Sequence, residues 1–333
     1  MHASIPIFHY SSIPPLGQYS TLFLTMPSLD SLVAEKAKSL GFIAVGFTGP
    51  GRPLHFDRFT AWLAEGKNAD MAWLGRNLDV REHPSKMLRD CRTIISLAYP
   101  YDARKPETLD GFSVARYADP VTEDYHARLR RLCGELASLI KEKAPGSRNR
   151  ICVDSAPLLE RSVAVAAGIG FLGKNNLLII PGYGSYFYLA EILTTAAVPF
   201  PSPDPLSSQC AACSRCLDSC PTGALEHPFV LNASRCLSYM TVEYGGGLKA
   251  DLGTIMAKCF FGCDRCQEAC PFNAEGHGSE IVLPSTEALL GMDEEGFHRD
   301  FGSTAFRRAG LEKLKRNIRA ARVVDGESPR PLA

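Results

Sequence analysis

The chain has 333 residues, of which 45% are hydrophobic and 22% are charged, and its formal net charge is zero. This is the composition of an ordinary soluble globular protein, long enough for two domains. Zero net charge excludes a polyanion partner held by the whole surface, so any such partner needs a local basic patch. No apolar run is long enough to span a bilayer, so we expect no membrane partner.

The first 25 residues are rich in proline and aromatic residues and contain no Lys or Arg. A secretory signal needs a basic start and an unbroken apolar stretch, and a twin-arginine signal needs its arginines. We therefore expect residues 1–27 to be a disordered extension, with Met26 as a candidate natural start. A cytoplasmic location follows, where thiols stay reduced.

Helices and strands alternate from Ser28 to about residue 198. The predicted helices cover 28–40, 54–66, 69–77, 122–143 and 155–167, and the predicted strands cover 42–47, 93–98, 151–154, 177–180 and 186–193. Gly41 and Gly168 supply helix stops. A Pro-rich linker at 199–205 ends this part of the chain, so we predict an α/β domain over residues 28–205.

Gly168-Ile-Gly170-Phe-Leu-Gly173 matches the G-x-G-x-x-G pattern of dinucleotide-binding proteins. That pattern needs a strand before it and a helix after it, whereas here a helix precedes and a strand follows. We interpret these glycines as a helix-ending turn, with nucleotide binding as the alternative.

Asp124-Tyr-His126 resembles the start of a D-x-H-x-x-G motif that supplies a histidine to cobalt in some cobalamin proteins. Leu129 stands where the glycine should be. We interpret His126 as a structural or pocket-rim residue rather than a cobalt ligand.

Asp154 ends a predicted strand and precedes a predicted helix, where open α/β sheets place ligand-binding residues. Ser155 is positioned to cap that helix, and the alternative role for Asp154 is also a helix cap. A helix N-terminus would lower the pKa of Asp154, whereas burial beneath an apolar cofactor would raise it. The sequence leaves that contest open.

Cysteines dominate residues 210–270. Cys210, Cys213, Cys216 and Cys220-Pro221 form C-x-x-C-x-x-C-x-x-x-C-P, and Cys263, Cys266 and Cys270-Pro271 repeat its last part. This spacing is typical of bacterial proteins with two iron–sulfur clusters, in which the fourth cysteine binds the other cluster. Zinc is the alternative, but zinc sites usually separate two pairs. A disulfide framework does not suit a long chain without an export signal.

Two cubane clusters need eight thiolates, and this stretch contains nine cysteines. We predict two [4Fe-4S] clusters with one cysteine, Cys259, left over. The first cluster is assigned Cys210, Cys213, Cys216 and Cys270, and the second is assigned Cys220, Cys236, Cys263 and Cys266. These residues place a ferredoxin-like domain at 206–285.

Residues 286–333 form a basic tail that we expect to be mostly helical at 304–322. From Arg299 to Arg330 there are nine Lys or Arg and four Asp or Glu. The cations recur at helical spacing, which is typical of a solvated helix face. The same concentration suits contact with nucleic-acid phosphates.

The order of several short motifs resembles the epoxyqueuosine reductase family over about residues 28–320. These motifs are Arg81-Glu-His-Pro, Asp124-Tyr-His126, Val153-Asp154-Ser155, Gly173-Lys-Asn175, Tyr183-Gly-Ser-Tyr186, Tyr188-Leu-Ala-Glu191, Cys220-Pro-Thr-Gly-Ala-Leu225, Arg235-Cys-Leu-Ser-Tyr239 and Gly262-Cys-Asp-Arg-Cys-Gln267. The resemblance implies an α/β cobalamin-binding domain, similar to that of reductive dehalogenases, followed by a ferredoxin-like module with two [4Fe-4S] clusters. It also implies removal of the epoxide oxygen of epoxyqueuosine in tRNA, the last step of queuosine synthesis.

The resemblance also implies roles for single residues. Asp154 matches the family's proton donor, and the eight assigned cysteines match its cluster ligands. Cobalamin contacts are implied for Arg81, Asp154, Lys174, Asn175, Leu178, Ser185, Tyr186 and Leu189, and tRNA contacts are implied for Glu160, Arg161 and Arg235. From the basic tail we add Arg316 as a predicted tRNA contact. The Pro-rich start has no counterpart in the family, and C-terminal helical repeats found in some members are missing here.

The implied mechanism passes electrons through both clusters to cobalamin while Asp154 protonates the departing oxygen. We expect a monomer that acts on tRNA with a separate, unidentified electron donor. Two alternatives remain open. One is a reductive dehalogenase-like reductase of small molecules, and the other is a ferredoxin-like electron carrier.

Overall fold

The computed structural model describes residues 27–102, 104–119, 123–200, 204–249, 252–273 and 281–323. The predicted N-terminal extension, apart from Pro27, lies outside these residues, as do the middle of the 199–205 linker and the end of the basic tail. Within the described part of the chain, no helix is both long and apolar enough to cross a membrane.

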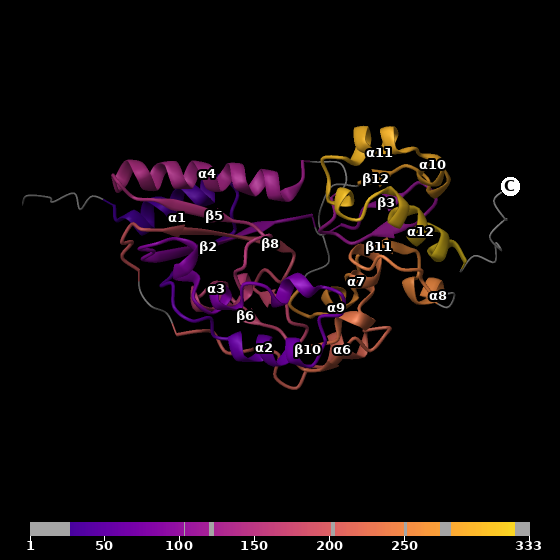
Figure 1. Cartoon of the computed structure of the whole chain (residues 1–333), viewed down its shortest axis with the longest axis horizontal. Helices are drawn as coiled ribbons and strands as arrows, with labels where there is room; N and C mark the ends of the chain where they lie inside the picture. Colours follow the sequence, from indigo (N-terminus) through magenta and orange to yellow (C-terminus); the bar gives the residue numbers. More distant parts are fainter. Residues whose placement is uncertain are drawn as a thin grey trace, which may run out of the picture.

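A four-stranded antiparallel sheet forms the centre of the N-terminal half (Figure 1). Its strands, in spatial order, are β1 (Ala44–Thr48), β2 (Thr93–Pro100), β8 (Phe187–Thr194) and β5 (Asn149–Cys152). The two central strands, β2 and β8, are almost wholly buried, because both faces of the sheet are covered. They therefore appear in the sequence as continuous apolar runs.

Two helices cover one face of this sheet. Both α1 (Leu29–Ser39) and α4 (Tyr125–Lys143) contribute buried side chains, including Val33 and Leu136, to a core shared with Ile95 of β2. Figure 1 shows the two helices on the same side of the strands. On the other face, α5 (Glu160–Ala166) packs against β1, β2 and β8. The predicted helices at 28–40 and 122–143 are confirmed.

Shorter elements complete the N-terminal half. They are α2 (Phe56–Ala64), η1 (Ala72–Gly75), α3 (Leu78–Glu82), η2 (Pro84–Met87) and the hairpin β6 (Phe171–Leu172) and β7 (Leu178–Ile179). The predicted helix at 69–77 is wrong: only the short turn η1 forms, and Asn77 takes a left-handed conformation that ends it.

Two boundaries next to Asp154 also differ from prediction. The strand expected at 151–154 ends at Cys152, and the helix expected from residue 155 begins only at Glu160. Leu159 is the N-cap residue of α5, and no side chain caps it. Neither Asp154 nor Ser155 caps this helix, because an irregular loop of seven residues separates it from β5.

The cysteine-rich segment folds into short elements joined by loops. In chain order they are α6 (Arg215–Asp218), β9 (Leu225–His227), β10 (Val230–Leu231), η3 (Ala233–Arg235), α7 (Leu237–Val242), α8 (Leu252–Met256), β11 (Cys259–Phe261) and α9 (Arg265–Glu268). The tail contributes β12 (Val282–Leu283), α10 (Thr286–Gly291), α11 (Glu294–Phe301), η4 (Ala305–Arg308) and α12 (Leu311–Arg322). The helical tail predicted over 304–322 is confirmed.

A second sheet joins segments that are far apart in the sequence. The hairpin β3 (Glu107–Thr108) and β4 (Ser113–Val114) pairs with β12 on one side and β11 on the other, in the order β11-β4-β3-β12. One hydrophobic core then combines Val114 with Phe261 of β11 and Leu314 of α12. The tail therefore packs as part of the cysteine-rich half (Figure 1), and the domain boundaries drawn at 205 and 285 stay predictions.

Candidate functional site

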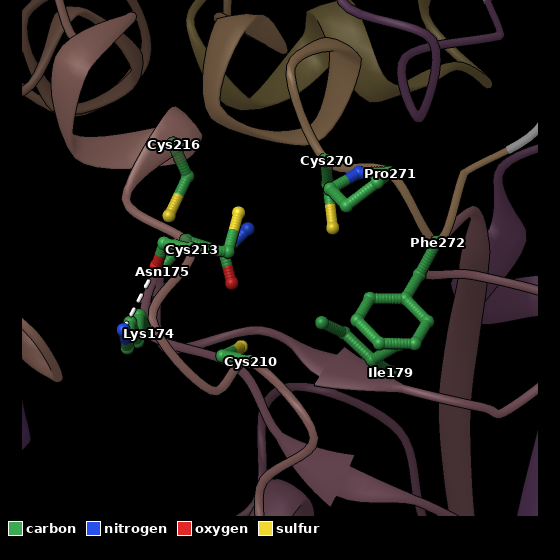
Figure 2. Close-up of a pocket in the computed structure, with 9 residues that line it drawn as sticks. All are labelled: Lys174, Asn175, Ile179, Cys210, Cys213, Cys216, Cys270, Pro271 and Phe272. Atoms are coloured by element: carbon green, nitrogen blue, oxygen red, sulfur yellow. Dashed lines mark hydrogen bonds between the residues drawn. The ribbon is translucent and has the colours of Figure 1, made fainter.

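The four thiols assigned to the first cluster surround one cavity. Cys210, Cys213, Cys216 and Cys270 line this pocket, together with Ile179, Phe272 and other residues. Figure 2 shows the four side chains around this common space. Cys270 comes from the second cysteine run, as the crossed ligand pattern requires.

The four thiols assigned to the second cluster lie close to one another. Burial raises the pKa of Cys266, and the neighbouring Cys263 and Cys236 add to that shift. Burial likewise raises the pKa of Cys236, with a smaller contribution from Cys220. Cys216, which belongs to the first set, also acts on Cys266. The two sets are therefore adjacent, which suits the passage of electrons between two clusters.

The thiols do not converge as ligands of a single ion would. All 12 cysteines are free, and the described residues contain no group of three or more His, Cys, Asp or Glu that could hold one metal ion. Cys259 lies on β11, near Lys105 and Cys263.

Hydrogen bonds join the cluster loops to the N-terminal half. Lys174 Nζ donates to the carbonyl oxygens of Ala211 and Cys213, and Asn175 Nδ2 donates to that of Cys266. Lys174 and Asn175, predicted to contact cobalamin, thus hold the loops that carry the cluster ligands.

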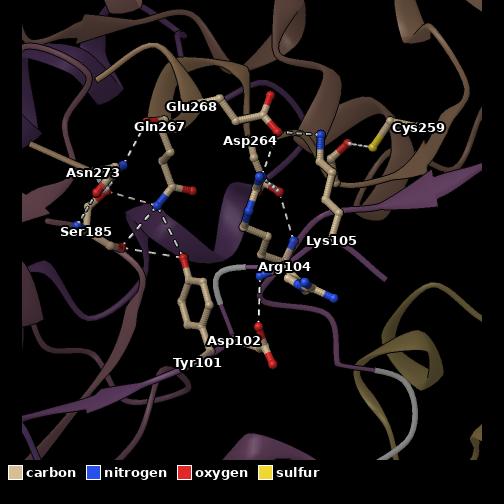
Figure 3. A network of polar contacts seen from close by, with 12 residues as sticks. Tyr101, Asp102, Arg104, Lys105, Ser185, Cys259, Asp264, Gln267, Glu268 and Asn273 are labelled. Atoms are coloured by element: carbon tan, nitrogen blue, oxygen red, sulfur yellow. Dashed lines mark hydrogen bonds and ion pairs between the residues drawn. The ribbon is translucent and has the colours of Figure 1, made fainter. Parts of the chain in front are cut away.

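Ser185 belongs to the same seam between the two halves (Figure 3). Its N–H donates to Asn273 Oδ1 over 2.6 Å, and its carbonyl oxygen accepts from Gln267 Nε2 over 3.0 Å. Gln267 also donates to Tyr101 Oη over 3.2 Å. Gly184 has to be a glycine here, because its φ is +105° and a Cβ atom would collide with Asn273.

The remaining predicted cofactor residues are apolar or buried. Leu178 and Leu189 belong to one apolar cluster beside the seam, and Tyr186 is buried beneath the Arg116 guanidinium. Arg81 is only 8% exposed, lies over the Phe59 ring, and has an Nε atom without a hydrogen-bond partner among the described residues.

The Asp154 carboxylate accepts hydrogen bonds from three residues on two different elements. Its Oδ2 lies 3.1 Å from Tyr125 Oη, 3.2 Å from His126 Nε2 and 3.4 Å from an Arg308 nitrogen. Tyr125 and His126 begin α4, whereas Arg308 comes from η4 in the tail. The Asp154 side chain is still 44% exposed, so a ligand can reach it.

These contacts decide the protonation of the site. The His126 hydrogen bond, opposed by burial and helped by Arg308 and Tyr125, lowers the pKa of Asp154. Burial disfavours a charged His126 ring, but its hydrogen bonds to Asp124 and Asp154 raise the pKa of His126 to about 9. At neutral pH the proton therefore resides on His126 and Asp154 is ionised.

Aromatic stacking fixes the two donors on α4. The Tyr125 ring stacks on His126 with centroids 4.0 Å apart, and on Tyr188 of β8 with centroids 4.3 Å apart. Asp124 caps the helix by accepting the His126 N–H. The stacked rings and the cap hold the His126 imidazole toward Asp154.

The residues predicted to contact tRNA are dispersed, and each of them has a partner within the protein. Arg316 donates to the backbone carbonyl oxygens of Met240, Tyr244 and Gly246, so its guanidinium holds the loop after α7. Arg161 donates to the carbonyl oxygen of Asn176. Arg235 is half exposed near Glu226. Their contacts with tRNA stay predictions.

Sequence reasoning missed Tyr125 and Arg308 as parts of the Asp154 site. Tyr125 lies inside the motif that was singled out, so the motif could have suggested it. Arg308 lies 154 positions from Asp154, and no local pattern connects them. The backbone carbonyl oxygen of Ser303 accepts the Asp124 N–H, and this contact brings the tail, with Arg308, to the start of α4.

Comparison with known proteins gives two family matches. Residues 81–155 match the family described as "Epoxyqueuosine reductase QueG, DUF1730", and residues 209–273 match "4Fe-4S double cluster binding domain". An epoxyqueuosine reductase from Xanthomonas campestris pv. campestris is 34% identical over 298 residues, covering 85% of this chain and 83% of the relative.

Solved structures agree with these matches. A crystal structure of epoxyqueuosine reductase with an epoxyqueuosine-modified tRNA-Tyr stem loop is similar with a TM-score of 0.79 and 31% identity, over 88% of this chain and 80% of that one. The Bacillus subtilis epoxyqueuosine reductase, solved with its catalytic aspartate loop swung out of the active site, gives a TM-score of 0.77 and 30% identity over the same shares.

Proposed function

The chain belongs to the epoxyqueuosine reductase family, and we propose that Asp154, paired with His126, supplies the proton for the reaction of this family. The protein reduces epoxyqueuosine in tRNA, and its double-cluster domain fits the electron transfer that this reduction needs. The observation that carries the proposal is the exposed Asp154 carboxylate, which is held by three donors and reaches solvent.

The proton follows a short route. Removing the epoxide oxygen as water takes two electrons and two protons. Asp154 is ionised in the resting site, so the first proton passes from His126 Nε2 to Asp154 Oδ2 and from there to the oxygen as the C–O bond breaks. Asp124 stabilises the charged imidazole beforehand from its other nitrogen. A positioned acid of this kind contributes roughly 10²–10⁴-fold to a rate.

The proposal assigns the eight cysteines to two [4Fe-4S] clusters as predicted. When bound, the clusters would carry electrons from one to the other. The seam formed by Ser185, Gln267 and Asn273 holds the second cysteine run against the N-terminal half. An acceptor of these electrons therefore belongs at this seam.

Cobalamin is the acceptor that we propose. When bound, it would supply the electrons to the epoxide carbon through its cobalt. Arg81 fits a large polar cofactor, since its buried Nε has no partner among the described residues. Leu178, Tyr186 and Leu189 would offer an apolar surface near the seam. Lys174, Asn175 and Ser185 would act through the cluster loops that they hold.

For tRNA, exposed cations of the tail are better placed than Arg316. Arg307 and Arg319 are exposed, and Arg307 adjoins the Arg308 that touches Asp154. Phosphates held there would bring the modified base of the anticodon loop toward Asp154. The proposal also includes a monomer in the cytoplasm with a separate electron donor.

Anaerobically reconstituted protein tests this function directly. It would be loaded with iron, sulfide and cobalamin, reduced chemically, and mixed with an epoxyqueuosine-modified tRNA stem loop. Mass spectrometry of the nucleosides should show loss of one oxygen. Product formation without cobalamin would contradict the proposed role of that cofactor. A failure of the fully loaded protein to form queuosine would contradict the proposed reaction.

A further inference from the structure

A glutamate is fully buried in the middle of β8. Ser96 Oγ on β2 donates to Glu191 Oε1 over 3.2 Å. The other carboxyl oxygen of Glu191, Oε2, makes no hydrogen bond of ordinary geometry within the described residues. A buried carboxyl is costly unless it is protonated or paired. We therefore expect the buried Glu191 carboxyl to have a specific role.

The neighbour of Glu191 is Glu160, the first residue of α5. Burial, helped by the charge of Asp154, raises the pKa of Glu160 to about 7. Burial and the nearby Glu160 carboxyl raise the pKa of Glu191 well above its usual value. The two carboxyls therefore keep their protons to higher pH than exposed glutamates do, because ionising both would place like charges side by side.

Other charged and titratable groups face this pair. Asp154 and Arg161 act on Glu160, and Arg81 lies near it. The Cys133 and Cys152 thiols face Glu191, and burial keeps the pKa of each at about 12. Both thiols are therefore neutral at pH 7 and add no charge beside the two carboxyls.

Glu160 makes one further contact, with the backbone of Asp154. Its Oε1 accepts the Asp154 N–H over 2.7 Å. Asp154 has a φ of +55°, in the left-handed region that non-glycine residues seldom occupy. Such a conformation persists only where surrounding contacts impose it. The backbone conformation of the loop between β5 and α5 therefore depends on this hydrogen bond, which is made at Asp154 itself.

We propose that Glu160 is a positioning residue, which, backed by Glu191, holds the left-handed turn at Asp154 and so sets where the Asp154 carboxylate meets the substrate. The inference rests on the proposed function, in which Asp154 delivers the proton. This role takes the place of the tRNA contact predicted for Glu160, because Oε1 of its carboxyl group is engaged with the Asp154 backbone.

Three variants test this role. Glu160→Ala removes the acceptor, whereas Glu160→Gln keeps a carbonyl oxygen that can still accept the Asp154 N–H. Glu35→Ala on the exposed face of α1 is the matched control. For each, hydrogen–deuterium exchange mass spectrometry would follow the peptide over 153–159. Single-turnover rate and tRNA stem-loop affinity would be measured on protein loaded with clusters and cobalamin.

We expect Glu160→Ala to exchange the Asp154 amide at least about tenfold faster and to lose roughly 10²-fold in single-turnover rate, the scale of a displaced catalytic group. Its tRNA affinity should be unchanged, and Glu160→Gln should restore both exchange and rate. Should the Ala variant not fold, Glu160→Asp, which shortens the side chain by one methylene, gives the same readouts.

Two results would overturn the inference. One is a hydrogen-exchange rate at the Asp154 amide that is the same in Glu160→Ala as in the unchanged protein. The other is a weakened tRNA affinity with normal exchange, which would return Glu160 to the tRNA interface. A fully active Asp154→Asn protein would instead reject the acid role of Asp154. The exchange measurement would still decide whether Glu160 holds the turn.

Discussion

His126 Nε2 lies 3.2 Å from Asp154 Oδ2, while Nδ1 of the same ring lies 2.8 Å from Asp124 Oδ1. The imidazole thus bridges two carboxylates, one at the start of α4 and one in the loop after β5. Both ring nitrogens donate only when the ring is charged. The geometry therefore places a proton beside the exposed Asp154 carboxylate.

Replacing His126 with Gln should remove that stored proton while keeping a donor near Asp154. The single-turnover rate should fall about 10²-fold, the lower end of general acid catalysis. In the unchanged protein the rate should decline as pH rises through about 9, where His126 loses its proton. The variant should lack this decline. A normal rate in His126→Gln, measured after chemical reduction, would contradict the role of the ring.

The same residue affects stability, with a defined sign. The folded-state pKa of His126 is raised from its usual 6.5 to about 9. Its contribution to stability is therefore complete below about pH 6.5 and is lost as pH rises through 9. Chemical denaturation from pH 6 to 10 should show a free energy of unfolding that falls over this range, and a smaller fall in His126→Gln.

Asp154→Asn should fold and load its cofactors but lose about 10²–10⁴-fold in single-turnover rate. Asn tolerates the left-handed conformation of this residue. Since Asp154 does not cap α5, a stability loss in Asp154→Ala should come from its lost contacts with His126 and Arg308 and not from an uncapped helix. Rates measured after prior reduction separate proton delivery from electron delivery. An Asp154→Asn protein with a near-normal rate would leave the acid to be found elsewhere.

Iron content tests the ligand assignment. Protein prepared without oxygen should contain about eight irons, as two cubanes require. Cys236→Ala should lose about half of this iron, whereas Cys259→Ala should keep all of it, because Cys259 lies outside both ligand sets. Iron analysis with electron paramagnetic resonance of the reduced protein would measure both. Equal losses from the two substitutions would show that the assignment is wrong.

The basic tail should divide into cations that meet tRNA and cations, such as Arg316, that hold the fold. Replacing Arg307 and Arg319 with Ala should make the slope of log affinity against log salt shallower by about 1.5, for two lost phosphate contacts. Lys38→Ala, on α1 in the other half (Figure 1), is the control. Arg316→Ala should instead destabilise the fold by about 2 kcal/mol, because three carbonyl groups lose their donor.

Buried acids should make stability depend on pH in the opposite direction from acids in ordinary ion pairs. The pKa of Glu160 is raised to about 7, so the unfolded chain loses this proton first and stability falls as pH rises from about 4.5 to 7. Glu191→Gln removes one of the two acids, and should reduce this fall by about 1–3 kcal/mol. Denaturation midpoints across this pH range would measure it.

Several parts of the molecule follow from local sequence patterns. The cysteine spacing predicted two cluster sets, and Cys210, Cys213, Cys216 and Cys270 do line one cavity. Apolar runs predicted β2 and β8, because a strand covered on both faces is apolar throughout. The glycines at 168–173 were interpreted as a turn, and the structure confirms it: a helix precedes them and a hairpin follows.

Contacts between distant segments were beyond local patterns. The sequence alone determined the cysteine spacing and the apolar runs of the sheet strands, since spacing and periodicity are carried by neighbouring residues. The order of its short motifs carried the resemblance to the family. Only the tertiary structure decided that Asp154 is ionised, because its pKa depends on His126 and on Arg308, a residue 154 positions away. It likewise decided that Arg316 faces backbone carbonyls and that Glu160 meets Glu191. Electrostatic neighbours are set by packing in space, and helical spacing cannot reveal which face of a basic helix is covered.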